Sequence, residues 1–212
     1  MQRKVGMNMN YDTLKAMEEQ HVTHTYNRFP IDLEHGKGAS CWDASGKHYI
    51  DFTSGIGVNA LGHCYQPWSD AISQQANKLG HTSNLFYTEP QIMLAKKLCD
   101  ITGCQSVFFA NSGAEANEAA IKAARKYGKT NKGDDCFEII GLHSAFNGRT
   151  FGALAATPQE IYQGPFKPML EGFAFAEANN FAALLDVVTE KTCAIIIEMI
   201  QGEGGLNNLK YE

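Results

Sequence analysis

The residues best suited to chemistry begin where an apolar stretch gives way to a helix, in the run FFANSGAEANEAAIKAARKYG. Ser112, Gly113 and Ala114 stand at the predicted start of that helix. The first N–H groups of a helix lack intrahelical partners, and the helix macrodipole places positive charge beside them. Small side chains leave these donors accessible, which indicates a phosphate site. Taken alone, however, so short a motif is better explained by Ser112 acting as a helix cap.

A second candidate group lies in the loop GLHSAFNGRT, directly after the predicted strand at residues 135–140. The aromatic face of Phe146 could stack on a flat ring, and the guanidinium of Arg149 could bind a carboxylate through two hydrogen bonds. Each residue in isolation is more simply a buried aromatic side chain or a surface charge. Their shared position after a strand favours a site, because ligands of α/β proteins bind at the carboxyl ends of strands.

The third candidate group is acidic and belongs to the predicted strand at residues 192–200 and the loop at residues 202–205. Glu198 interrupts an apolar run, where an unpaired carboxylate costs several kcal/mol. We therefore predict a specific partner for Glu198, either in a structural ion pair or in a site. Glu203 lies in the loop that follows, so three predicted strand ends converge on one edge of a sheet.

The histidines and cysteines give a weaker signal. His63 and Cys64 are adjacent, so their side chains point apart and do not form a nucleophile–base pair. The seven histidines and six cysteines show no spacing typical of a zinc site. We therefore predict no metal site, and reduced, mostly buried thiols.

The three candidate groups must be positioned by the predicted helices and strands, which follow an α+β pattern in the first part of the sequence and an α/β pattern in the rest. Up to about Leu61 the sequence predicts a short helix, an antiparallel β unit and a Gly-rich loop, at residues 11–23, 31–52 and 54–63. Beyond Leu61, apolar strands alternate with helices, which implies a mostly parallel sheet with flanking helices. The predicted strands are residues 105–110, 135–140, 151–156 and 192–200, and the predicted helices are residues 67–80, 89–102, 114–127 and 180–189. We therefore predict an N-terminal segment at residues 1–61 and a large domain at residues 62–212.

Composition and charge narrow the class of protein. The chain has 212 residues, 44% of them hydrophobic, and a formal charge of −5. An acidic balance argues against nucleic acid or an anionic membrane as partner, because such partners demand clustered Lys and Arg. The sequence carries no signal-peptide pattern and no membrane-length apolar run. A cytoplasmic protein is the resulting expectation.

The end of the sequence suggests an incomplete domain. The predicted strand at residues 192–200 is strongly apolar, yet only QGEGGLNNLKYE follows it. An α/β domain rarely stops on such a strand, since the apolar face of its sheet would lie bare. We therefore expect a truncated chain.

Five motifs, in order, resemble one family. NALGH, HTSNLFYTEP, FFANSGAEANEAAIKAARKYG, AFNGRT and TCAIIIEMIQGEGG are similar to the first half of a class III, ornithine-type aminotransferase that depends on pyridoxal phosphate. Within the family the resemblance is closest to the acetylornithine aminotransferases. It implies fold type I of the pyridoxal-phosphate-dependent transferases, and pyridoxal 5'-phosphate as cofactor. It covers the sequence from about Phe29 to Leu206.

The resemblance also implies a role for each candidate residue. The cofactor-binding residues would be Ser112, Gly113, Ala114, Phe146 and Glu198. The first three would hold the phosphate, Phe146 would stack on the pyridine ring, and Glu198 would lie near the cofactor. Arg149 would bind a substrate carboxylate, and Glu203 would steer an arginine as the two substrates alternate.

The implied reaction moves the terminal amine of N2-acetyl-L-ornithine to 2-oxoglutarate by a ping-pong sequence, as in arginine biosynthesis. Relatives are homodimers with sites at the subunit interface. Gly55 favours the acetylated donor, because ornithine δ-aminotransferases tend to have tyrosine at this point. Succinylornithine, ornithine and 4-aminobutyrate stay open as donors, and so does a catabolic role.

Three departures from the family pattern qualify the resemblance. Asn147 stands in place of a histidine, and Met199 in place of a proline. The D-E-x-Q motif and the Schiff-base lysine match no position in this sequence, so we expect no catalytic residue here and an inactive fragment. The alternative of another class is a non-catalytic module that binds phosphate or serves in assembly.

Overall fold

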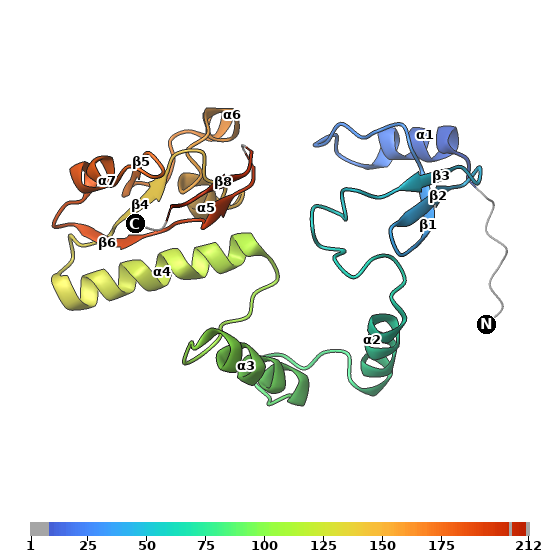
Figure 1. Ribbon diagram of the computed structural model, residues 1–212, viewed down its shortest axis with the longest axis horizontal. Helices are drawn as coiled ribbons and strands as arrows, with labels where there is room; N and C mark the ends of the chain where they lie inside the picture. Colours follow the sequence, from blue (N-terminus) through green and yellow to red (C-terminus); the bar gives the residue numbers. More distant parts are fainter. Residues whose placement is uncertain (1–8, 204, 211–212) are drawn as a thin grey trace. The chain divides into compact units, whose positions relative to one another are not determined.

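The computed structural model describes residues 9–203 and 205–210 (Figure 1). The chain divides into two compact units, Met1–Thr88 and Glu89–Glu212. Each unit is described by itself. The domain boundary expected near Leu61 stays a prediction.

The first unit contains the predicted helix and antiparallel β unit. Asn10 caps the helix, because its side chain accepts a hydrogen bond from Thr13 N at 3.0 Å. Each strand of the sheet pairs antiparallel with the next along the chain, in the order β1-β2-β3. These elements are α1 (Tyr11–His21), β1 (Leu33–Lys37), β2 (Ser40–Asp43) and β3 (His48–Ile50).

Asp43 organises the turn between β2 and β3. Its carboxylate accepts hydrogen bonds from Ser45 N at 3.0 Å, Lys47 N at 2.9 Å and the Tyr49 hydroxyl at 2.8 Å. The Ser45 hydroxyl, a fourth donor, makes the largest contribution, and together these donors lower the pKa of Asp43 to about 2 against the opposing effect of burial. The turn between β2 and β3 is therefore held by one carboxylate that accepts hydrogen bonds from several donors.

Turns and two helices follow. Residues 54–63 form turns rather than a regular element, as the glycines there predict, and Gly55 has φ +59. Helix α2 spans Gln66–Lys78, with a proline in its first turn. Helix α3 spans Glu89–Thr102, the range predicted from the sequence, and belongs to the second unit.

The second unit is built on a three-stranded parallel sheet in the order β5-β4-β6. Its strands are β4 (Glu138–Leu142), β5 (Phe173–Ala176) and β6 (Thr192–Ile195). Helix α4 (Gly113–Lys132) packs against β4 and β6, and helix α7 (Phe181–Val187) packs against β5. The expected mixed α/β fold with a mostly parallel sheet is therefore confirmed.

Helix α4 approaches the sheet closely at one point. A Cβ added to Gly128 would lie 2.3 Å from Cys136 O and 2.6 Å from Cys193 Cβ. Beside it, Ile121 and Ile139 are 3% and 1% exposed, in the core of the unit. The apolar face of the helix thus meets the sheet through Ile121, Ala124 and Gly128.

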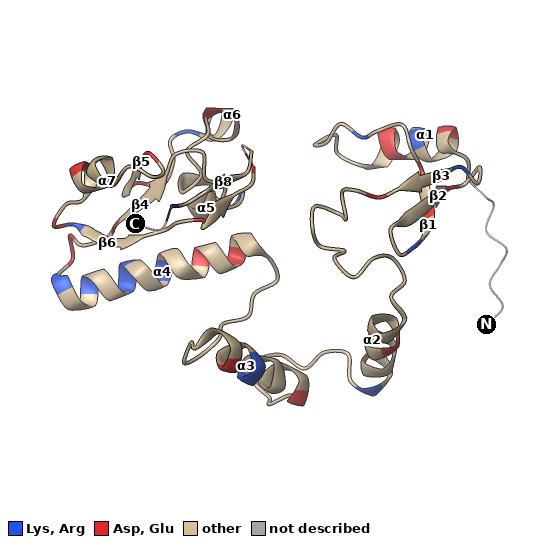
Figure 2. Cartoon of the chain, in the orientation of Figure 1, with Lys and Arg blue, Asp and Glu red and all other residues tan. Residues whose placement is uncertain are grey.

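The ends of α4 carry opposite charges (Figure 2). Glu115 lies in the first turn, and Lys129 and Lys132 lie in the last. This distribution complements the helix macrodipole.

Two predicted strands are wrong. Residues 105–110 are not a strand, because a strand needs a hydrogen-bonded neighbour and the described part of the chain supplies none. Phe108 in this segment is accordingly 73% exposed. Residues 151–156 instead form helix α5 (Phe151–Ala155). A short apolar run does not distinguish a buried helix from a buried strand, and here its small residues pack against α4.

The remaining elements refine the prediction. The strand expected at residues 192–200 ends at Ile195, and Ile200–Gln201 forms β7, paired antiparallel with β8 (Asn207–Asn208). Strand β5 was not predicted, because its four residues offer too short a pattern. Between α5 and β5 lie α6 (Glu160–Gln163) and a 3-10 turn, η1 (Gly164–Phe166).

Candidate functional site

The start of α4 is both capped and accessible. Ser112 is the N-cap, and its hydroxyl accepts a hydrogen bond from Glu115 N at 3.1 Å. Ser112 O accepts from Ala116 N at 3.0 Å. Within the described chain this leaves the N–H groups of Gly113 and Ala114 without a recorded partner, and a Cβ added to Gly113 would meet nothing within 4 Å. Capping and anion binding are therefore compatible here, since the Ser112 hydroxyl can still donate its proton.

The nearby carboxylate of Glu115 is engaged with the chain before the helix. Its Oε2 accepts from Asn111 N at 2.7 Å and from Asn111 Nδ2 at 3.0 Å. This reciprocal arrangement resembles a capping box. It orients the negative charge of Glu115 toward Asn111.

The start of α4 touches the loop that carries Arg149. Gly148 has φ +124, and a Cβ added to it would lie 2.8 Å from Ala114 Cβ. Asn117 Nδ2, one turn into the helix, donates to Asn147 O at 2.6 Å. The first and second candidate groups, which lie more than thirty residues apart, are thus in direct contact.

Asn147, at the position where the resemblance implies a histidine, is a buried residue that holds this loop through hydrogen bonds. It is 7% exposed. Its backbone N–H donates to Thr157 Oγ1 at 2.8 Å, and its side-chain Nδ2 donates to Ala156 O at 2.7 Å. Although Asn147 departs from the family pattern, its hydrogen bonds to Thr157 and Ala156 give it a structural role.

Glu118 makes a further connection that the sequence did not indicate. Its Oε1 accepts from Thr150 Oγ1 at 2.5 Å and from Ala153 N at 3.0 Å, so it caps α5 from a neighbouring helix. Burial acts to raise the pKa of Glu118, but these donors outweigh it and the pKa is lowered. The sequence showed only a charge that complements the helix dipole.

Glu198 has the specific partner that its sequence position predicts. Its Oε1 accepts a hydrogen bond from Phe146 N at 2.7 Å, across 52 residues of chain. Nearby, Gln201 Nε2 donates to His143 O at 2.9 Å. The segment after β6 is therefore fixed to the loop after β4, which joins the second and third candidate groups.

Tyr162 joins Arg149 and Glu203 and was not identified from the sequence. The guanidinium carbon of Arg149 lies 4.3 Å from the centre of the Tyr162 ring, and the Tyr162 hydroxyl donates to Glu203 Oε1 at 2.8 Å. The bond to Glu203 and burial raise the pKa of Tyr162. An aromatic residue in a short helix between strands gave no sequence signal.

Aromatic contacts complete what we call the loop cluster, which consists of Phe146, Arg149, Tyr162, Glu198 and Glu203. The rings of Phe146 and Tyr162 meet edge to face with centres 5.9 Å apart. The guanidinium carbon of Arg149 also lies 5.8 Å from the centre of the Phe146 ring. The structure thus brings together the four residues predicted in the second and third groups. Of the predicted loop at residues 202–205, Gly204 lies outside the described residues.

None of the described helices combines the length and the apolar character needed to cross a bilayer.

Sequence comparison agrees with the resemblance found in the motifs. Residues 21–212 match the family model described as aminotransferase class-III. The chain is 48% identical over 202 residues to the acetylornithine aminotransferase of Haemophilus ducreyi, covering 95% of this chain and 51% of that protein. It is 49% identical over 199 residues to the acetylornithine aminotransferase of Methanocaldococcus jannaschii, covering 94% and 50%. The chain therefore spans about half the length of the curated relatives it matches.

Structure comparison supports the same fold. The crystal structure of the ornithine aminotransferase from Toxoplasma gondii matches with a TM-score of 0.89 and 30% sequence identity, over 95% of this chain and 48% of that one. The fold predicted from the resemblance, that of the pyridoxal-phosphate-dependent aminotransferases, is confirmed.

Proposed function

This chain belongs to the class-III aminotransferase family, and from that premise we propose that it supplies the cofactor and substrate loops of an aminotransferase. The cofactor is pyridoxal 5'-phosphate, the amino donor is N2-acetyl-L-ornithine, and the acceptor is 2-oxoglutarate. The relatives from Haemophilus ducreyi and Methanocaldococcus jannaschii carry the name of that activity.

The observation that carries the proposal is the convergence of three separate segments. The contact between Gly148 and Ala114 joins the start of α4 to the loop after β4. The bond from Phe146 N to Glu198 joins that loop to the segment after β6. Ligands of parallel α/β sheets bind at this kind of edge, outside the carboxyl ends of the strands.

The residues at the start of α4 fit a phosphate group. The N–H groups of Gly113 and Ala114 and the hydroxyl of Ser112 are its donors, and the open space at Gly113 admits the anion. Phe146 offers a ring face, and Glu198 fixes the backbone of Phe146. The cofactor, when bound, would supply the electron sink for moving the amino group.

Arg149 and Glu203 are assigned to the substrate. Arg149 carries a guanidinium that binds a carboxylate through two hydrogen bonds. Glu203 and Arg149 both contact Tyr162, so a movement of one is transmitted to the other through that ring. This connection supports the steering role that the family resemblance implies for Glu203.

The resemblance assigns the Schiff-base lysine to no position in these 212 residues. We therefore propose that a polypeptide of this sequence holds the cofactor without a covalent bond and does not transaminate. Treatment with borohydride in the presence of the cofactor, followed by peptide mass analysis, tests this. A single lysine labelled in stoichiometric yield would refute it.

A non-catalytic role in assembly is the second candidate, and one observation favours it. Large apolar side chains of the first unit are nearly fully exposed, including Phe52 at 91%, Ile56 at 95% and Tyr87 at 98%. Exposed apolar groups of this kind mark interaction surfaces. They equally support the homodimer implied by the family. Sedimentation of the purified chain, alone and mixed with a full-length relative, distinguishes self-association from pairing with that relative.

The experiment that tests the proposed reaction uses the complete coding region that contains this sequence. Amine transfer to 2-oxoglutarate is measured with N2-acetyl-L-ornithine, N2-succinyl-L-ornithine, ornithine and 4-aminobutyrate as donors. We expect the acetylated donor to have the highest kcat/KM, and Arg149→Lys to raise KM more than it lowers kcat, because Lys lacks the planar fork. Preference for unacetylated ornithine would contradict the donor assignment. A cytoplasmic location and a place in arginine biosynthesis stay predictions.

A further inference from the structure

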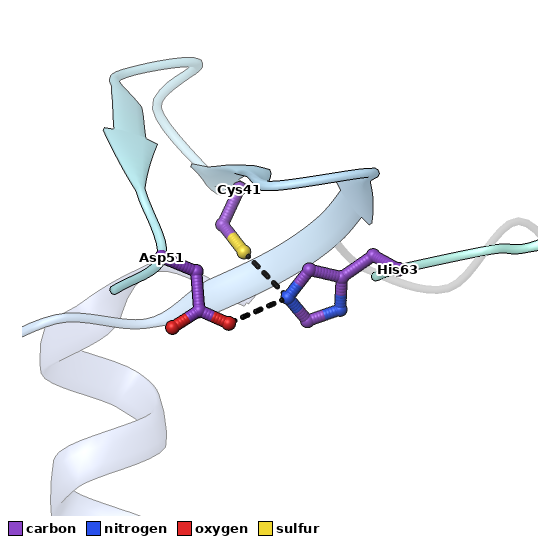
Figure 3. A group of neighbouring side chains, drawn as sticks. All are labelled: Cys41, Asp51 and His63. Carbon is purple, nitrogen blue, oxygen red and sulfur yellow. Dashed lines mark hydrogen bonds and ion pairs between the residues drawn. The ribbon is translucent and has the colours of Figure 1, made fainter. Parts of the chain in front are cut away.

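Three side chains with different ligand chemistry meet in the first unit, at residues that the proposed function does not use (Figure 3). Nε2 of His63 lies 3.1 Å from Sγ of Cys41 and 3.0 Å from Oδ2 of Asp51. The three ligand atoms lie within 4.8 Å of one another. We call Cys41, Asp51 and His63 the thiol–imidazole cluster.

The backbone of the β unit places all three residues. Cys41 lies within β2 and is 3% exposed. Asp51 follows β3 directly, and its N–H donates to Ala39 O at 2.8 Å. His63 pairs with Gly38 through two backbone hydrogen bonds of 2.9 and 2.8 Å, as one more rung beside the sheet. The side chains therefore converge from three backbone positions fixed by strand pairing.

A glycine makes room for the imidazole. Gly36 lies opposite Cys41 in the β1–β2 register. A Cβ added to Gly36 would lie 2.6 Å from Cγ of His63. The ring of His63 thus occupies the space that any larger residue at position 36 would fill, close to the thiol of Cys41.

Asp51 is oriented by donors on the oxygen that faces away from the cluster. Oδ1 accepts from Thr53 N at 2.9 Å, Thr53 Oγ1 at 2.8 Å and Ser54 N at 2.9 Å. Oδ2 is left to face His63. Outer partners that hold one carboxylate oxygen and aim the other are typical of ligating carboxylates.

The geometry does not suit a nucleophile–base–acid relay. In a relay the carboxylate bonds one imidazole nitrogen while the nucleophile lies at the other. Here Cys41 and Asp51 both face the same nitrogen, Nε2 of His63, as the two dashed lines in Figure 3 show. A thiol sulfur, an imidazole nitrogen and a carboxylate oxygen within 4.8 Å of one another are instead close enough to coordinate one cation.

We propose that Cys41, Asp51 and His63 bind Zn²⁺, with the fourth position taken by water or another small ligand. Thiolate, imidazole and carboxylate are the ligands that zinc takes in proteins, and three protein ligands with one open position are common outside closed structural sites. Binding releases the thiol proton of Cys41 to solvent and requires the imidazole proton of His63 to reside on Nδ1.

The required movement is small for two of the three pairs of ligand atoms, and the third pair, Sγ of Cys41 and Oδ2 of Asp51, lies within 4.8 Å. Zinc lies about 2.3 Å from sulfur and about 2.0–2.1 Å from nitrogen, so the ligand atoms of a tetrahedral site are about 3.3–3.6 Å apart. The pairs observed at 3.1 and 3.0 Å must open by a few tenths of an ångström. A change of χ1 at His63 or Asp51 can supply this without moving the strands.

The test is titration of the full 212-residue chain, reduced and free of metal, with Co²⁺ and then with Zn²⁺. We expect one Co²⁺ per chain, a thiolate-to-cobalt charge-transfer band and the visible bands of four-coordinate cobalt, all displaced by stoichiometric Zn²⁺. The absence of these bands from the unmodified chain overturns the proposal, and so does binding through nitrogen and oxygen alone. This measurement does not depend on any variant folding.

Variants then assign the ligands. Cys41→Ser, Asp51→Asn and His63→Gln should each weaken Zn²⁺ binding by more than the about 10–100-fold that loss of an outer partner costs. Cys64→Ser removes the exposed neighbouring thiol and should leave affinity and spectrum unchanged. Asp43→Asn controls for damage to the β unit, because Asp43 organises its turn without belonging to the cluster. If Cys64→Ser abolishes the charge-transfer band, or Cys41→Ser keeps it, the assignment fails.

Discussion

The thiol–imidazole cluster and the loop cluster are assembled by different means. In the first unit, strand pairing and one isolated bridge fix the backbone of Cys41, Asp51 and His63, and local donors orient the carboxylate of Asp51. In the second unit, the five residues of the loop cluster lie outside the sheet. They are held by hydrogen bonds between residues distant in sequence, from Phe146 N to Glu198 and from the Tyr162 hydroxyl to Glu203. Loss of one cluster side chain should therefore leave the backbone of the first unit in place, whereas loss of one hydrogen bond in the second unit should loosen the loop cluster.

Of the substitutions that test this comparison, Gly148→Ala should cause the largest loss in the free energy of unfolding of the second unit. Gly148→Ala adds a Cβ 2.8 Å from Ala114 Cβ at φ +124. We expect a loss of about 2–5 kcal/mol, because left-handed strain of about 1–2 kcal/mol and overpacking of about 1–3 kcal/mol combine. Urea unfolding of the second unit measures it.

Gly133→Ala is the matched control for Gly148→Ala. Gly133 has a similar φ of +108, but a Cβ added there would meet nothing within 4 Å. It should therefore show only the strain component, about 1–2 kcal/mol. Equal losses for the two variants would mean that the contact between α4 and the loop contributes nothing.

Loss of the hydrogen bond between Glu198 and Phe146 N should cause the next largest loss in the free energy of unfolding. Glu198→Ala leaves Phe146 N without its acceptor, and we expect a loss of about 1–2 kcal/mol, since Glu198 is only half-buried. Glu198→Gln keeps an acceptor and should recover most of it. Unfolding curves, together with the fluorescence of bound pyridoxal phosphate, measure the two variants. Equal losses of stability in Glu198→Ala and Glu198→Gln would show that the charge of Glu198, rather than its hydrogen bond to Phe146 N, stabilises the loop.

Acid should weaken the first unit through Asp43. Its pKa in the folded chain is about 2, below the ordinary value of 3.8, so its contribution is present above about pH 4 and is lost as the pH falls toward 2. Asp43→Asn should flatten the pH dependence of unfolding in that window. An unchanged acid transition in this variant would assign the dependence to other carboxylates.

The smallest effect is expected at Tyr162. Tyr162→Phe keeps the ring under Arg149 and loses only the exposed bond to Glu203, so we expect less than about 1 kcal/mol. Tyr162→Leu also removes the cation–π contact and should cost about 0.5–1 kcal/mol more. If the proposed transamination is measured, we expect these variants to change KM for the donor and the acceptor unequally. An equal change for both would argue against a connection between Arg149 and Glu203.

Much of the fold was predictable because local patterns agree with tertiary packing. The proline in the first turn of α2 and the glycine pattern at residues 54–63 act within a few residues. The failures at residues 105–110 and 151–156 are short apolar runs. For such runs the choice between strand, helix and extended chain depends on neighbours that are distant in sequence.

Some residues of the candidate site could likewise be predicted from the sequence, and others could not. Glu198 was recognisable because a carboxylate in an apolar run demands a partner, although the identity of that partner, Phe146 N, was not. Glu118 and Tyr162 gave no signal, since a glutamate and a tyrosine in helices are ordinary until their contacts are seen.

The sequence by itself determined the family and indicated the start of α4 and the loop residues as candidates for a site, because motif order and helix-start chemistry are local properties. Only the tertiary structure decided which of these residues touch. It also brought Cys41, Asp51 and His63 together, although their spacing resembles no metal motif. The physical reason is that strand pairing sets the distances between side chains through backbone hydrogen bonds. The register of those bonds cannot be predicted from the spacing of the residues along the sequence.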